Sequence, residues 1–375
     1  MAARRGREVP LARRQLTHEP VKLGLALGGV ALAVALVGLL FGLREGIGRQ
    51  VTTYADHAGA DVYVAAPESS SLVTAGPAAL DARLADEVRG VPGVADAGAI
   101  IAELGVLRLH DQKVATLLVG FDRGRPGGPW ELEEGRAPRA GREIAVDGVM
   151  ADAHDLELGD PVTVRGRRLR VVGLTAKTAS WMTPLVFVPR VVAGELQGRR
   201  NAASFVIARA NGISPDALAE RLRSRLEGMN VLTKHELARN DRELMAASFN
   251  APLLVMVLIA LAVGALVIAI TTYGFVAERR REFGSLKAIG ARNARLYRVV
   301  SVQAVAIALV GLAAGIALRE AAGATIESIW PKFLFVSLPG HYALTLAAAL
   351  VMGLVGALVP ARVIARLDPA EVFRR

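Results

Sequence analysis

The stretch that decides the fold of this chain is residues 276–292, which read VAERRREFGSLKAIGAR. It is rich in arginine, and it lies between two long runs that are almost free of charge, 251–277 and 299–318. A short segment with an excess of Lys and Arg between two apolar runs is typical of a cytoplasmic loop that joins two membrane helices. We therefore expect residues 278–298 to form a short loop on the cytoplasmic side of a membrane.

The same stretch also carries apolar residues at a spacing of three, namely Phe283, Leu286 and Ile289. This spacing places the three side chains along one side of a short helix. Gly290 then favours the left-handed conformation that ends a helix, and Asn293 can cap a second helix. A charged elbow with an apolar ridge, too short to cross a bilayer, indicates a surface that docks into another protein.

The composition points to a membrane protein. Hydrophobic residues make up 53% of the chain and aromatic residues only 5%, which is typical of membrane helices. The net charge of +10 comes from residues 1–22, 276–298 and 361–375, which hold 17 of the 45 Lys and Arg residues but only 6 of the 35 Asp and Glu residues. Because these basic segments flank apolar runs, the charge indicates membrane topology and argues against a nucleic-acid-binding surface.

Four runs are long and uncharged enough to cross a bilayer as helices: 23–43, 251–277, 299–318 and 333–361. The first continues into Arg44-Glu45, so we expect a permanent anchor and no cleaved signal peptide. The predicted fold is four transmembrane α-helices with a large extracytoplasmic α+β domain between the first and the second. The other segments are a basic cytoplasmic tail (1–22), the α+β domain with a stalk helix at its end (44–250), the cytoplasmic elbow (278–298), a short outer loop (319–332) and a second cytoplasmic tail (362–375).

Residues 44–250 alternate between strand-like and helix-like patterns, which predicts one mixed domain. The predicted elements are strands at 61–65, 143–146, 158–164 and 169–174, a hairpin of 104–109 with 113–121 that turns at 110–112, and helices that begin at Pro77, at Ser214-Pro215 and at the capping box 233–236.

The elbow resembles the coupling region of ABC permeases of the MacB, FtsX, LolC and DevC type. The pattern of that family runs roughly ER-x-R-E-[IF]-G-x-L-[RK]-A-[IL]-G-A, and residues 278–291 match it. The C-terminal signature of the family is matched between Pro360 and Arg374, with Leu367-Asp368-Pro369 at its centre. Residues 143–174 are similar to a segment in the periplasmic domain of MacB-like proteins.

This resemblance implies a permease subunit that works by mechanotransmission, in which closure of a separate ATPase moves the elbow, the membrane helices and the outer domain. ATP and Mg²⁺ would bind to the ATPase, and this chain would carry no cofactor. The expected partners are the ABC ATPase, a second copy of the chain, a periplasmic adaptor or a cell-wall hydrolase, and the lipids of the cell (inner) membrane. The resemblance implies that the ATPase contacts a ridge of Phe283, Leu286 and Ile289 with a polar rim of Arg281, Glu282 and Lys287.

The sequence offers no catalytic or metal-binding constellation. No Gly-Lys pair occurs in the chain, so the phosphate-binding loop of an ATPase is absent. Asp152, His154 and Asp155 are close in sequence, but their spacing fits no ligand pattern, so we expect a surface turn there. The predicted spans contain no Asp, Glu, Lys or Arg, which argues against an ion-coupled transporter.

Three pairs of glycines lie four residues apart in the apolar runs, a spacing that lets two helix backbones approach closely. They are Gly24 and Gly28, Gly38 and Gly42, and Gly311 and Gly315. We single out Gly311 and Gly315 as a candidate contact between two copies of the chain.

Three functions remain open at this point. Export together with a periplasmic adaptor, as in MacB or DevC, is favoured by the size of the outer domain. An FtsX-like complex that does not transport, and that activates a cell-wall hydrolase, is the second. A membrane-tethered sensor or binding module is the third, and it leaves the apolar ridge of the elbow unexplained.

Overall fold

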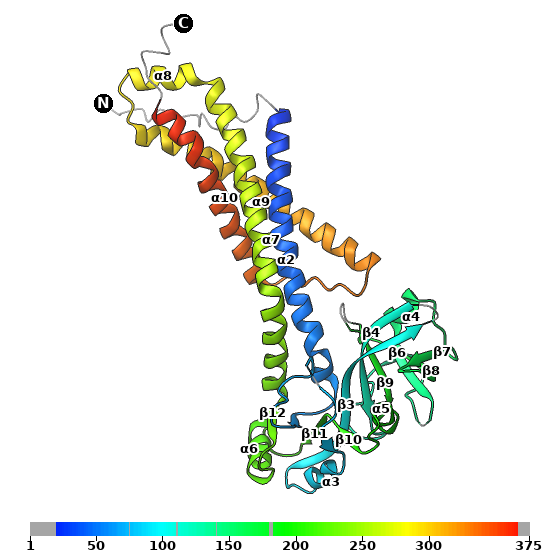
Figure 1. Cartoon of the computed structure of the whole chain (residues 1–375). Coiled ribbons are helices and arrows are strands. Elements are labelled where there is room, and N and C mark those ends of the chain that lie inside the picture. Colours follow the sequence, from blue (N-terminus) through cyan, green and yellow to red (C-terminus); the bar gives the residue numbers. More distant parts are fainter. Residues whose placement is uncertain (1–19, 75, 110–111, 140, 180–182, 367–375) are drawn as a thin grey trace. The chain divides into compact units, whose positions relative to one another are not determined.

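The structure is a computed structural model, and it describes residues 20–74, 76–109, 112–139, 141–179 and 183–366 (Figure 1). The chain divides into two compact units. The helical unit comprises the chain up to Arg44, Asn250–Ile329 and the chain from Phe335 onward. The α+β unit comprises Glu45–Phe249 and Trp330–Leu334.

The long helices of the chain are α2 (Pro20–His57), α7 (Lys234–Glu278), α9 (Asn293–Ile329) and α10 (Pro339–Ala365), and the short helix α8 (Arg280–Ala288) lies between α7 and α9. Within the described residues, the four long helices are long and apolar enough to cross a membrane. All four extend beyond the predicted apolar spans at one end or both, and α10 begins at Pro339, six residues later than the predicted span 333–361. Residues 319–329, predicted as part of an outer loop, are helical because Ala, Glu and Arg favour helix as a continuation of α9.

Within the helical unit, α2 packs closely against two glycines of α9. A Cβ atom on Gly311 would lie 2.5 Å from Val30, and a Cβ atom on Gly315 would lie 2.6 Å from Val34. Because the residue numbers rise together on both helices, α2 and α9 run in the same direction, as the first and third spans of a four-span chain must. These glycines therefore make an intramolecular contact, and the structure does not leave them free for the predicted contact between two copies.

Farther along the same two helices the arrangement is reversed. Here the glycines lie on α2, and the large residue that packs against them lies on α9. Arg319 is only 5% exposed, and Gly38 and Gly42 leave room for its side chain. Its guanidinium pairs with Glu320 and lies 5.4 Å from the centroid of the Tyr342 ring on α10. Arg319 lies just beyond the predicted end of the third span at residue 318, so nothing in the sequence indicated that this charge is buried.

The α+β unit contains a large mixed sheet flanked by short helices (Figure 1). Its strands are β1 (Val62–Ala65), β3 (Val94–Leu109), β4 (Gln112–Phe121), β5 (Leu132–Gly135), β6 (Glu143–Asp147), β7 (Pro161–Val164), β8 (Arg167–Thr175), β9 (Leu185–Pro189), β11 (Phe205–Ala210) and β12 (Asn230–Thr233). A separate pair of strands is β2 (Leu80–Asp81) with β10 (Ala202–Ala203). The short helices are α3 (Leu84–Arg89), α4 (Gly148–Ala153), α5 (Arg190–Leu196) and α6 (Pro215–Arg225).

Six strands of the large sheet close into a ring. The order β12-β1-β11-β3-β4-β9-β6-β8-β5 is linear, but β7 pairs with both β3 and β8, which joins the ends of the series β3-β4-β9-β6-β8. Residues that alternate along these strands, such as Leu107, Leu118 and Val186, form a buried cluster. The ring is therefore a small barrel with an apolar interior.

The open part of the sheet is covered on both faces. Val64 and Val206 lie in a cluster with Leu218 of α6 and with residues of α3. Ile207, from the opposite face, lies in a cluster with Tyr54 near the end of α2. Burial on both faces explains why β1 and the first four residues of β11 are apolar without alternation.

Most of the elements predicted for this unit are confirmed. The hairpin is β3 with β4, paired from Leu109 with Gln112 onward, and its turn residues 110–111 lie outside the described residues. The turn between β7 and β8 has a positive φ at Arg165 and Gly166, as a two-residue hairpin turn requires. α6 begins after the cap residue Ser214, and α7 begins at the predicted capping box.

The helix predicted to begin at Pro77 is wrong. The backbone N–H of Ala78 donates to the Gln197 side chain, and the backbone carbonyl of Ala78 accepts from Arg199. Leu80 then pairs with Ala203 in the small sheet, and the helix of this region, α3, begins only at Leu84. Tertiary hydrogen bonds to the segment after α5 thus override the local helix signal.

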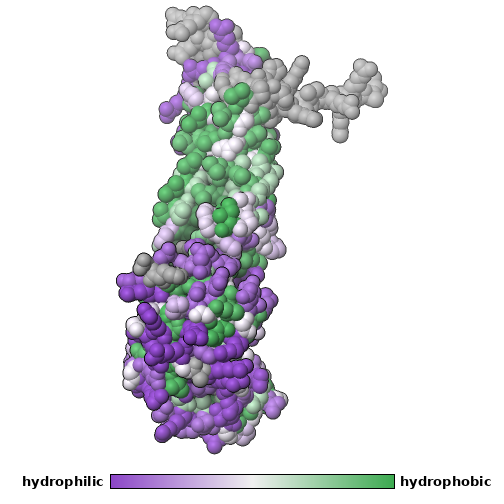
Figure 2. Space-filling model, turned by 90° about the vertical axis from the view of Figure 1, so that its right-hand side faces the viewer, coloured by the Kyte–Doolittle hydropathy of each residue, from purple (hydrophilic) through white to green (hydrophobic). Residues whose placement is uncertain are grey.

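The surfaces of the two units differ in kind. Figure 2 shows a band of hydrophobic surface on the helices and a mainly hydrophilic surface on the α+β unit. The exposed large apolar residues of α7 include Leu254, Leu258 and Ile270. Such a band on helices of this length is what a surrounding bilayer requires.

The contact between α2 and α9 can be tested by enlarging one glycine. We expect Gly315→Leu to lower the stability of the purified protein by about 1–3 kcal/mol, because the new side chain would overlap Val34. Gly28→Leu is the matched control, since nothing lies within 4 Å of a Cβ atom at Gly28. Thermal unfolding in detergent measures the difference, and an equal loss in both variants would contradict the assigned contact.

Candidate functional site

The elbow between α7 and α9 is a short helix that begins after one non-helical residue. α7 ends at Glu278, and Arg279 leaves the helical conformation with φ −110° and ψ 24°. The Phe283 N–H donates to the Arg279 carbonyl at 3.1 Å, which begins α8 in a new direction. The elbow is thus a separate helix and not a continuation of α7.

Gly290 ends α8 as the sequence predicts. It has a φ of +94°, and its N–H donates to the Lys287 carbonyl at 3.0 Å. The Ala291 N–H donates to the Leu286 carbonyl at 3.0 Å, which completes a Schellman motif. The sequence predicts Asn293 as the cap residue before the next helix, but α9 already begins at Asn293.

Phe283 faces into the protein, which changes the predicted ridge. It is 9% exposed and belongs to a buried cluster with Phe275, Leu296 and Ile364. The predicted ridge required Phe283 to be available to a partner, and the structure places it instead as the anchor that holds α8 against the other helices. The spacing of the apolar residues correctly predicted a helix, but it could not show that Phe283 lies on the buried side of that helix.

Leu286 and Ile289 are the part of the ridge that stays exposed. Leu286 lies on α8 with an exposed fraction of 48%, and Ile289 directly follows the helix with an exposed fraction of 85%, both high for large apolar residues. Arg281 and Glu282 are exposed beside them, and Glu282 is 3.8 Å from Arg279. The outer surface of the elbow is therefore an apolar pair among charged residues.

Lys287, predicted to belong to the polar rim, lies against α10. Its Nζ donates to the backbone carbonyls of Ala365 at 2.7 Å and of Ile364 at 3.4 Å. A cation that binds the last carbonyls of a helix stabilises that end of the helix. The elbow is thereby tied to the end of α10, whereas the C-terminal signature residues 367–374 lie outside the described residues.

A second polar site joins the stalk part of α7 to a loop of the α+β unit. Asp241 lies on α7 before the apolar run and is fully buried. Its Oδ1 accepts from the Ser71 hydroxyl and from the Leu72 N–H at 2.9 Å, while its Oδ2 has no partner within the described residues. Burial raises the pKa of Asp241 to about 6, although these hydrogen bonds act in the opposite direction.

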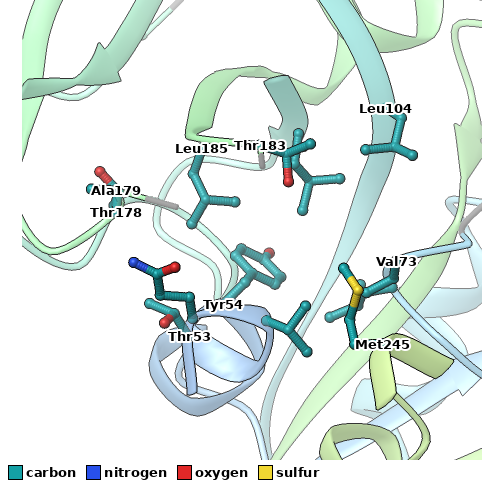
Figure 3. A pocket seen from close by; sticks show the side chains of 13 residues that line it. Thr53, Tyr54, Val73, Leu104, Thr178, Ala179, Thr183, Leu185 and Met245 are labelled. Atoms are coloured by element: carbon teal, nitrogen blue, oxygen red, sulfur yellow. The ribbon is translucent and has the colours of Figure 1, made fainter. Parts of the chain in front are cut away.

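A pocket of about 90 Å³ lies beside this loop (Figure 3). Leu72 and Val73 form one wall, Leu104 of β3 another, and Met245 of α7 a third. Figure 3 shows Val73, Leu104 and Met245 around the same space as Tyr54 and Leu185. The pocket is mainly apolar, and it has no counterpart in the sequence analysis.

No three His, Asp or Glu side chains gather as metal ligands in the described part of the chain. Asp152 lies in the last turn of α4, His154 directly follows the helix, and Asp155 has a φ of +51°. These residues therefore form a turn at the end of a helix.

The sequence matches two protein families along most of its length. The family described as MacB-like periplasmic core domain matches residues 23–225, more than half of the chain. The family described as FtsX-like permease C-terminal matches residues 254–369. The chain belongs to the MacB/FtsX family of ABC transporter permeases. It is a multi-pass membrane protein whose large extracytoplasmic α+β domain lies between the first and second membrane helices.

Two of the relatives differ in how much of this chain they cover. The permease is 28% identical to an uncharacterized ABC transporter permease of Mycobacterium tuberculosis over 98% of this chain and 97% of the relative. It is 29% identical to the macrolide export ATP-binding/permease protein MacB of Agrobacterium fabrum over 55% of this chain and 33% of that protein.

Two solved domains are similar to the extracytoplasmic part of the permease. The extracellular domain of YknZ from Gram-positive bacteria has a TM-score of 0.36 and 18% identity, and it covers 46% of this chain and 98% of that domain. The periplasmic region of MacB from Actinobacillus actinomycetemcomitans has a TM-score of 0.37 and 14% identity, with 48% and 92% covered.

The raised pKa of Asp241 predicts a pH-dependent stability of the permease. The folded domain holds this proton to a higher pH than the unfolded chain, in which the carboxyl has its ordinary value of 3.8. The stabilisation is therefore complete below about pH 4, is lost as the pH rises toward about 6, and amounts to about 3 kcal/mol at most. We expect wild type to lose more stability than Asp241→Asn between about pH 4.5 and about pH 6.5.

Thermal unfolding of the α+β domain, followed by tryptophan fluorescence in the full chain, measures this difference. Asp216→Asn, at an exposed carboxyl of α6, is the control and should behave as wild type. Identical pH profiles for wild type and Asp241→Asn would show that the buried carboxyl does not titrate in this range.

Proposed function

We propose that this permease couples ATP hydrolysis on a separate ATPase subunit to movement of its extracytoplasmic domain, and that this mechanotransmission drives export. The observation that carries the proposal is the exposed apolar pair formed by Leu286 on α8 and Ile289, the residue directly after α8. Exposed large apolar residues among charges are typical of a protein interaction site. The chain itself has no Gly-Lys pair for a phosphate-binding loop, which supports a separate ATPase and no catalytic activity here.

The elbow is well placed to pass on a displacement, because it is bound to several membrane helices. Phe283 anchors it in the cluster that includes Leu296 of α9, and Lys287 binds the end of α10. Through Arg279 it follows α7 directly, and α7 is one helix from Glu278 back to Lys234. A partner that moves α8 therefore acts on α7, α9 and α10 together.

The proposed assembly contains two copies of the permease and two ATPases, with both termini in the cytoplasm. The arginine-rich elbow supports this orientation through the positive-inside rule. The contact between the copies does not use Gly311 and Gly315, since these pack on α2. A periplasmic adaptor is the proposed partner of the extracytoplasmic domain, and a cell-wall hydrolase is the alternative.

The orientation can be tested with single cysteines, because the natural chain has none. Ser70 and Ala294 are both exposed, the first in the α+β domain and the second at the start of α9. We expect Ser70→Cys to react with a membrane-impermeant maleimide in intact cells, and Ala294→Cys to react only after permeabilisation. Labelling of Ala294→Cys in intact cells would reverse the proposed orientation.

The coupling surface can be tested by placing carboxylates on the exposed pair. Burial of a Leu or Ile side chain in a partner contributes about 1.5–3 kcal/mol, and a buried carboxylate adds a penalty. We therefore expect Leu286→Asp with Ile289→Asp to release the ATPase that copurifies with the wild-type permease from its native membrane. Pull-down followed by mass spectrometry measures the retained ATPase.

Two further variants separate docking from folding. Arg292→Gln with Arg295→Gln, at exposed cations, should retain most of the ATPase, because exposed ion pairs contribute about 0–1 kcal/mol each. Phe283→Asp should instead lower the melting temperature of the permease, because it opens the buried cluster. Retention of the ATPase at wild-type level by the Leu286→Asp, Ile289→Asp variant would exclude this surface as the coupling site.

A further inference from the structure

The pocket of the α+β domain has mainly apolar walls, and four of the five polar side chains that line it, all but Thr183, have hydrogen-bond partners among the described residues. The Gln50 amide donates to the Lys332 carbonyl at 2.9 Å, and the Tyr54 hydroxyl donates to the Gly127 carbonyl at 2.9 Å. The Thr178 hydroxyl donates to Asp147 at 2.6 Å. A ligand in this pocket is therefore recognised by apolar contact, and an aliphatic chain fits that requirement better than a group that needs hydrogen bonds.

The pocket continues into an exposed apolar strip on the outside of the barrel. Leu104 and Leu117 line the pocket and are paired across β3 and β4. The next pair on the same face, Val106 with Ala115, is exposed, and Val106 has an exposed fraction of 52%. Because alternate residues of a strand share a face, this strip runs from the pocket along the hairpin.

Two cations end the strip. Arg108 is paired with Lys113 across the hairpin, on the same face as Leu104, and both side chains are exposed. Arg108 lies about 13 Å along the strand from Leu104. Neither cation has a hydrogen bond or an ion pair with the described residues, whereas Arg165 and Arg167 nearby on the barrel are paired with carboxylates. The strip is thus apolar at one end and positively charged at the other.

We propose that the pocket and the strip bind a single-chain anionic amphiphile such as a long-chain carboxylate. The end of its aliphatic chain enters the pocket between Leu104 and Met245, and its anionic head lies between Arg108 and Lys113. One wall of the pocket, Leu72 and Val73, is held by Asp241 on α7, so the stalk helix supports the binding site directly. The proposal concerns binding alone and does not depend on the coupling to an ATPase.

The experiment uses the full-length permease in lipid discs without ATP, with a photoreactive diazirine palmitate as the probe. Peptide mass spectrometry then locates the labelled residues. We expect labels on β3, on β4 or near Met245, and competition by unlabelled palmitate. The corresponding diazirine alcohol, which lacks the charge, should label the same residues more weakly.

Two variants test the two ends of the site. The double variant Arg108→Glu, Lys113→Glu should reduce palmitate labelling of β3, β4 and the region near Met245 about fivefold to tenfold, because two charge contacts with the anionic head are lost. Leu104→Glu should reduce labelling by the acid and by the alcohol alike. Arg209→Glu with Arg225→Glu is the control of equal charge, since both arginines are exposed elsewhere on the domain.

Thermal unfolding of each variant confirms that the domain is folded. Labelling that is confined to the membrane helices would overturn the proposal. Equal labelling of wild type and of the Arg108→Glu, Lys113→Glu variant would also overturn it, because the anionic head would then have no part in binding.

Discussion

The helical unit depends on close packing between α2 and α9, in which large residues of each helix lie against glycines of the other. Lipid is as apolar as a leucine side chain, so membrane helices associate through close packing and polar contacts. Val30 and Val34 pack on glycines of α9 at one end of the contact, and Arg319 packs on glycines of α2 at the other. α7 and α10 use the same principle, with a glycine of α10 at position 356 facing Ile268.

The elbow, which we propose as the coupling surface, uses its inner and outer sides differently. Phe283 packs in the buried cluster, and Lys287 binds the carbonyls at the end of α10. Leu286 and Ile289 are instead exposed at the surface. The elbow is therefore fixed to the other helices on its inner side, while its outer side is apolar and exposed.

Local signals in the sequence predicted the fold well where they were strong. The capping box at Thr233, the glycine that ends α8 and the apolar runs all gave elements that the structure contains. The signals were weaker where contacts distant in sequence decide the outcome. Glycine spacing predicted close approach, but it could not show that Gly38 and Gly315 belong to one intramolecular contact. Likewise, no pattern near Asp241 indicates its bond to Ser71, because these residues are 170 positions apart.

The burial of Arg319 has a consequence for the order in which the chain is assembled in the membrane. A charged residue is costly in an apolar environment until it has partners. Its neighbour Glu320 and the space at Gly38 and Gly42 exist as soon as α9 has been made. Tyr342, whose ring covers the guanidinium, belongs to α10 and is synthesised later. The environment of Arg319 is therefore complete only after α10 has entered the membrane and packed against α9.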